Sequence, residues 1–107
     1  MRLGGRVSEA AAKTAALLKA MWEKNLPVLR ERVGVLSAAA EASARGELEE
    51  GLRVEAAGVA HKLAGSLGMF GYPEGTRVAR ELEMVLGGVE HTRLSELVRE
   101  LRDVLPL

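Results

Sequence analysis

The sequence predicts an all-α fold, an antiparallel up-down four-helix bundle with an additional N-terminal flanking helix. Apolar residues recur at the three- and four-residue spacing of buried helix faces through most of the 107 residues. No segment shows the strict alternation of a half-buried strand. Tight connections at residues 71–73 and 87–92 favour antiparallel neighbours, because short loops join helix ends that lie side by side.

The first predicted helix spans residues 8–24 and flanks the bundle. Ser8 is a suitable cap residue, and Trp22 is more typical of a packing anchor than of a binding residue. The apolar face of this helix consists of Ala11, Ala15, Leu18 and Trp22.

The four-helix bundle is predicted over residues 26–105, within a single domain that covers residues 1–107. Pro27 follows Asn25 and fits the first turn of a new helix. One long helix that is kinked at Pro27 is the alternative. Gly46 is a suitable C-terminal cap and ends the helix that contains Pro27.

Glycine and proline residues mark the ends of the remaining helices. Acidic residues from Glu47 onward favour the start of the third helix, and Gly71 ends it. Pro73 begins the fourth helix, which Gly87 and Gly88 interrupt. The last helix is predicted from its inward apolar positions, which are Leu94, Leu97, Val98, Leu101 and Leu105.

Composition excludes several classes of function. The 15 basic and 15 acidic residues balance, which argues against a nucleic-acid binder, and the absence of cysteine excludes disulfides and thiol catalysis. No apolar run approaches the roughly 18 residues of a membrane span, and the N-terminus lacks the apolar core of a signal peptide. We therefore expect a cytoplasmic monomer that binds neither membrane nor nucleic acid. The start at Met1 and the Pro-Leu end fit a free-standing protein.

One of the two histidines, His61, is predicted to point outward from the third helix. At about 100° per residue, it lies about 160° from the apolar stripe that contains Val59 and Leu63. Its neighbours on the helix surface are small and uncharged, whereas other outer faces of this chain carry Glu, Lys and Arg. These neighbours are Ala57, Gly58, Ala64 and Gly65, with Gly68 one turn further on.

An imidazole on a surface of small residues favours a phosphate-accepting histidine over which another protein docks closely. Much of the imidazole is unprotonated near neutral pH, so it acts as a nucleophile without a dedicated base. Each interior glycine costs about 1 kcal/mol relative to alanine and adds nothing to the core. Ala57, Gly58 and Gly68 are therefore interpreted as part of a docking surface for a partner.

Other kinds of site find little support in the sequence. Two histidines 30 residues apart, without supporting ligands, predict no metal site, and His91 is interpreted as a solvated loop residue. The closely spaced glycines of residues 65–71 follow no strand, so they do not indicate a nucleotide-binding loop. No constellation of catalytic side chains is recognisable, so we expect no enzymatic turnover by this chain and no cofactor of its own.

The stretch A-H-K-L-A-G-S-L-G-M-F-G, residues 60–71, resembles the signature of the histidine-containing phosphotransfer (HPt) domains of bacterial phosphorelays. The resemblance covers residues 26–105 in architecture and is sharp over residues 57–83. It implies a four-helix bundle whose exposed histidine accepts phosphate from a receiver-domain aspartate or a histidine kinase, and passes it to another receiver. The matching positions are His61, Leu63, Ala64, Gly65, Ser66 and Gly71, followed by Arg80-Glu81-Leu82-Glu83.

The resemblance implies a role for each matched residue. His61 is the phosphoacceptor, and Gly65 and Gly68 give clearance for the partner. Ser66 fixes the local helix packing or bonds a neighbouring backbone group. The partners are a response regulator receiver domain, which supplies magnesium, and a sensor histidine kinase. The residues expected next to the phosphate are Lys62, Ala64, Gly65 and Ser66.

One position departs from the family pattern. Many members carry lysine three residues after the histidine, where this chain has Ala64. Lys62, Arg77 and Arg80 are the candidates for the missing positive charge. Two other interpretations stay open: a non-phosphorylated helical adaptor that binds receivers or kinases through the same face, and a homodimer that buries this face.

Overall fold

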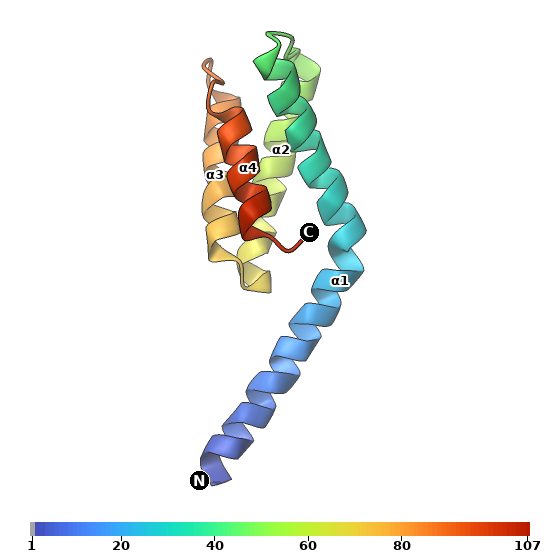
Figure 1. The fold of residues 1–107 in the computed structure, drawn as a ribbon, viewed down its shortest axis with the longest axis vertical. Helices are drawn as coiled ribbons and strands as arrows, with labels where there is room; N and C mark the ends of the chain where they lie inside the picture. The colour runs from blue at the N-terminus through green and yellow to red at the C-terminus, as the bar shows by residue number, and fades with distance from the viewer. Residues whose placement is uncertain (1) are drawn as a thin grey trace.

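The structure is a computed structural model that describes the chain from residue 2 to residue 107, with side chains from residue 8 onward. The predicted all-α four-helix bundle is confirmed (Figure 1), and no strand occurs between residues 2 and 107. The elements are α1 (Arg2–Ala44), α2 (Glu50–Ser66), the 3₁₀ helix η1 (Leu67–Phe70), α3 (Pro73–Gly87) and α4 (Leu94–Val104).

Helix α1 runs through Pro27 instead of ending before it. The predicted break is absent, and the alternative of one long helix through Pro27 is correct, so the predicted flanking helix over residues 8–24 is the N-terminal part of α1. Pro27 cannot donate to the carbonyl of Glu23, and its ring crowds the preceding turn. Figure 1 shows that α1 changes direction in the segment that contains Pro27. The helix bends there and continues because residues with good helix propensity lie on both sides.

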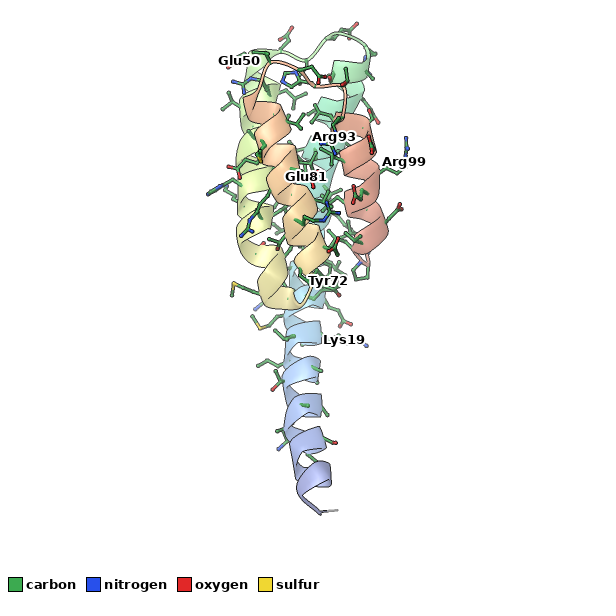
Figure 2. The ribbon with its side chains drawn as sticks, turned by 90° about the vertical axis from the view of Figure 1, so that its left-hand side faces the viewer. Lys19, Glu50, Tyr72, Glu81, Arg93 and Arg99 are labelled. Atoms are coloured by element: carbon green, nitrogen blue, oxygen red, sulfur yellow. The ribbon has the colours of Figure 1, made fainter. Side chains whose placement is uncertain are left out.

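The N-terminal extension, residues 2–21 of α1, projects beyond the bundle (Figure 1), and the molecule measures 60 × 21 × 18 Å. The extension meets the bundle at Trp22, whose side chain is only 6% exposed. Its ring lies edge-on to Phe70 of η1, with 5.4 Å between centroids, and 4.6 Å from the ring of Tyr72. The interpretation of Trp22 as a packing anchor is confirmed. Figure 2 shows Tyr72 at this lower end of the bundle, just above Lys19 on the extension.

Two glycines reverse the chain by adopting positive φ angles, 69° at Gly46 and 89° at Gly71. Beyond α1, the amide of Glu47 donates to the carbonyl of Ala42 at 2.8 Å, which is the Schellman arrangement of a helix end. Beyond η1, the amide of Tyr72 donates to the carbonyl of Leu67 at 3.0 Å in the same manner. Both predicted caps are confirmed, and α3 begins at Pro73 as predicted.

The core consists almost entirely of aliphatic side chains, and no polar or charged residue from residue 8 onward is buried as a whole. Leucines at three- and four-residue spacing supply most of it, as the apolar stripes predict. None of the described helices has an apolar stretch sufficient to cross a lipid bilayer. Fully buried positions include Val33 and Leu36 of α1, Leu63 and Leu67 of α2 and η1, Val78 and Leu82 of α3, and Leu97 and Leu101 of α4.

Candidate functional site

His61 lies on the outer face of α2, with a side chain that is 75% exposed. The opposite face of α2 is anchored in the core by Ala56, Ala60 and Leu63, each with no exposed surface. Because α2 is held by that buried face, the imidazole is presented to solvent from a rigid support. The predicted outward orientation of His61 is confirmed.

The small residues around His61 lie on the same outer face. Gly58, Gly65 and Gly68 are exposed, and Ala57 and Ala64 are half-buried. A methyl group added at Gly58 or Gly65 would meet no described atom within 4 Å, whereas one at Gly68 would lie 3.3 Å from Oγ1 of Thr76 on α3. Packing within the chain therefore accounts for Gly68 but not for Gly58 or Gly65.

Glu83 of α3 holds the imidazole from one side. Its Oε2 lies 2.9 Å from Nδ1 of His61. A carboxylate only accepts hydrogen bonds, so Nδ1 must carry the proton, and in the neutral ring Nε2 then bears the free lone pair. The pair consequently fixes both the ring orientation and the tautomer that leaves Nε2 available as a nucleophile.

The sequence resemblance included Glu83 in an acidic run but gave it no role. Glu83 can be identified from its spacing along the chain. His61 lies 11 residues before Tyr72, and Glu83 lies 11 residues after it. In two antiparallel helices joined by a tight turn, residues equally far from the turn lie opposite one another. Thr76 and Gly68, each 4 residues from Tyr72, follow the same register and are also in contact.

We expect Glu83→Ala to reduce the ratio of the Nδ1-protonated to the Nε2-protonated tautomer of His61 by about fivefold. Hydrogen bonds to charged groups contribute about 1.5–3 kcal/mol, and exposure reduces this value. Nitrogen-15 NMR of the imidazole measures the ratio directly. Glu83→Gln, which keeps an acceptor but loses the charge, should give an intermediate value. Equal spectra for all three proteins would contradict this role of Glu83.

The three candidate cations differ in what they already bind. Arg77 is held by carboxylates, donating to Glu74 at 3.0 Å, to Glu81 at 2.6 Å and also to Glu100 of α4. The hydrogen bonds to Glu100 and Glu74 raise the pKa of the Arg77 guanidinium further above its usual range. Lys62 and Arg80 are exposed, and neither makes a hydrogen bond or ion pair with any residue that the structure describes.

Of the two roles that the resemblance implies for Ser66, the structure does not show the hydrogen bond to a neighbouring backbone group, and a role in the local helix packing stays a prediction. The Oγ of Ser66 is buried and finds no partner among the described residues. The hydroxyl is thus shielded from solvent. Oγ1 of Thr76 is also buried without a partner.

The second histidine, His91, lies in the loop before α4, where its Nε2 donates to the carbonyl of Gly88 at 2.9 Å. It is remote in sequence from His61 and contributes to a different end of the bundle. Among residues whose side chains the structure describes, no group of three His, Cys, Asp or Glu side chains is arranged to hold a metal ion.

Comparisons with known proteins show which family this chain resembles. The family model described as Hpt domain matches residues 16–106. Protein RcaC from Microchaete diplosiphon is 34% identical over 83 residues, which are 78% of this chain but only 13% of RcaC. The chain thus spans a small part of the length of that relative. A search of solved structures found no significant match.

Proposed function

Because the chain belongs to the Hpt domain family, we propose that His61 accepts a phosphoryl group from a receiver-domain aspartate or a histidine kinase, and donates it to a response regulator receiver. Family membership indicates phosphotransfer in two-component phosphorelays. The observation that carries the assignment to His61 is its exposed imidazole, whose Nδ1 is held 2.9 Å from Glu83. This arrangement leaves Nε2 free on a surface of small residues.

The transfer is a single displacement at phosphorus. The Nε2 lone pair of His61 attacks the phosphorus of the receiver's phosphoaspartate, the N–P bond forms, and the aspartyl O–P bond breaks. The receiver's aspartate departs as a carboxylate with the electron pair. A kinase would present the γ-phosphoryl group of ATP to the same nitrogen, with ADP as the leaving group. Onward transfer is the reverse step toward a second receiver.

Glu83 supports both directions of this step. Nδ1 keeps its proton throughout, so the phosphorylated ring carries a positive charge beside the Glu83 carboxylate. The carboxylate therefore stabilises the charge that forms when Nε2 attacks. The receiver is expected to supply the magnesium ion, while this chain supplies a nucleophile in fixed orientation. The chain acts as a carrier and not as an enzyme with its own turnover.

The test is transfer of a labelled phosphoryl group from a phosphorylated, magnesium-loaded receiver domain to this chain. A label that is lost in acid but kept in base, and that moves on to a second receiver, would support the proposal. Receiver binding without any label would favour the adaptor, and a dimer that hides His61 would favour the structural role. Either of these two results would overturn phosphotransfer.

The exposed glycines near His61 yield a separate prediction. Gly65→Ala is expected to raise the free energy of unfolding by about 0.5–1 kcal/mol, because Gly65 lies in a helix and a methyl group there has open space. The same methyl group should slow transfer about fivefold or more, since overpacking a close interface costs about 1–3 kcal/mol. Thermal melts and transfer kinetics measure the two effects.

Gly34→Ala is the matched control. Gly34 lies inside α1, is exposed, and has no described atom within 4 Å of an added methyl group. We expect the same gain in stability with no change in the transfer rate. If the two variants transfer equally fast, the surface around Gly65 is not where the partner docks.

A further inference from the structure

We propose that Arg80 of α3 binds the phosphoryl group that His61 carries. The inference rests on the proposed phosphotransfer function and names the residue of this chain that neutralises the new charge. Three observations carry it, namely the register between α2 and α3, the placement of the other cations, and the open space beside Arg80.

The register of α2 against α3 brings Arg80 next to the turn of α2 that follows His61. Two contacts fix this register: His61 with Glu83, 2.9 Å apart, and Gly68 with Thr76, where an added methyl group would lie 3.3 Å from Oγ1. Both pairs are equally spaced from Tyr72 along the antiparallel helices. By the same spacing, Arg80 lies opposite Ala64, three residues after His61.

Phosphorylation makes a cation necessary at this place. A phosphoryl group adds about two negative charges, and the Glu83 carboxylate already lies against the same imidazole. The positive ring and the Glu83 carboxylate offset each other, so the phosphoryl charges still lack a counter-charge, and a positive group near them stabilises the phosphorylated state. An arginine is well suited because its planar fork of N–H donors matches the oxygens of a phosphoryl group.

The other two cations are less well placed. Arg77 is occupied by Glu74, Glu81 and Glu100 on the side of α3 that faces α4. Figure 2 shows Glu81 and Arg93 close together on that side, and their side chains are joined by a 3.2 Å ion pair. Arg77 would have to leave its carboxylate partners to reach a phosphoryl group.

Lys62 lies on the flank of α2 that faces away from α3. Arg53 of α2 donates to the carbonyl of Leu86 on α3 at 2.7 Å, which identifies the flank facing α3. Lys62 follows Arg53 by 9 residues. At about 100° per residue, it therefore lies about 180° around the helix from Arg53, on the opposite face of α2. A phosphoryl group held between α2 and α3 is therefore closer to the side from which Arg80 extends.

Arg80 is exposed, and no described ion pair holds its guanidinium in place. Its side chain lines a surface groove of about 400 Å³ with Gly68 and Thr76, and Arg77 and Glu81, which are paired with each other, line the same groove. Since no described carboxylate holds its guanidinium, Arg80 loses no existing ion pair when it binds a phosphoryl group.

The test compares Arg80→Ala with the wild type after phosphorylation by phosphoramidate, a small donor that needs no docking. Phosphorus-31 NMR titration measures the pKa of the phosphoryl group, which a nearby cation lowers. We expect this pKa to rise by about half a unit in Arg80→Ala and to return toward the wild-type value in Arg80→Lys. The equilibrium with a phosphorylated receiver should shift about fivefold toward the receiver.

Arg99→Ala is the matched control, because Arg99 is an exposed arginine that projects from α4 away from the bundle (Figure 2). It should leave the phosphoryl pKa unchanged. An unchanged pKa in Arg80→Ala, or the full rise in Lys62→Ala instead, would overturn the role of Arg80 alone. A wild type that takes no phosphoryl group from either donor would overturn the proposed function itself. Arg80→Gln replaces Arg80→Ala if circular dichroism shows loss of helix.

Discussion

Replacing His61 with glutamine is expected to abolish phosphorylation of this chain while leaving its fold intact. The glutamine amide offers no nucleophilic nitrogen lone pair, so no N–P bond forms. The side chain of His61 is 75% exposed and contributes nothing to the core, so its loss should change the free energy of unfolding by less than about 0.5 kcal/mol. Transfer assays and thermal melts on the same protein sample measure both results.

His91→Gln provides the control for this substitution, because it removes the other histidine from a loop at a different end of the bundle. Phosphorylation should proceed at the wild-type rate in that variant. Label that persists in His61→Gln would mean that another side chain is the acceptor. Label lost from both variants would point to an effect on the fold, which the melting curves would reveal.

Replacing Trp22 with alanine is expected to cause the largest loss of stability among the substitutions considered, about 3 kcal/mol or more. Trp22 is 6% exposed, and its ring contacts both Phe70 and Tyr72. Truncation therefore removes buried apolar area, leaves a cavity, and breaks two aromatic contacts. For a chain of this size, the melting temperature should fall by more than about 10 °C.

Leu17→Ala is the appropriate comparison, since Leu17 lies on the same helix but is 62% exposed. It should change stability by less than about 0.5 kcal/mol. Equal melting temperatures for the two variants would show that Trp22 does not join α1 to η1 in solution. Circular dichroism is the suitable measurement, because the substitution removes the only tryptophan of the chain.

The features predicted correctly from the sequence are those that depend on residues close together in the chain. The core stripe of α2 and the outward direction of His61 follow from helical spacing alone. The chain reversals at Gly46 and Gly71 follow from the backbone freedom of glycine. Each of these signals is complete within a few residues, so no knowledge of the tertiary structure was needed.

The features that were missed depend on residues far apart in the chain. The continuous helix through Pro27 was predicted only as an alternative, because the burial of Trp22 and Leu29 on either side of Pro27, which supports the helix together with local propensity, is not visible in the sequence. Glu83 contacts His61 only because α2 and α3 pair in one particular register. The burial of the Ser66 hydroxyl likewise depends on the switch from α2 to η1, which periodicity does not reveal.

The continuity of α1 has a mechanical consequence for the bundle that carries His61. Helix α1 resists bending least at Pro27, where a backbone hydrogen bond is lacking. The buried side chains of Trp22 and Leu29 attach α1 to the bundle on either side of Pro27. The bending stiffness at Pro27 therefore comes from side-chain packing against the bundle. A force on the N-terminal extension is therefore transmitted to the whole bundle as long as Trp22 and Leu29 stay packed against it.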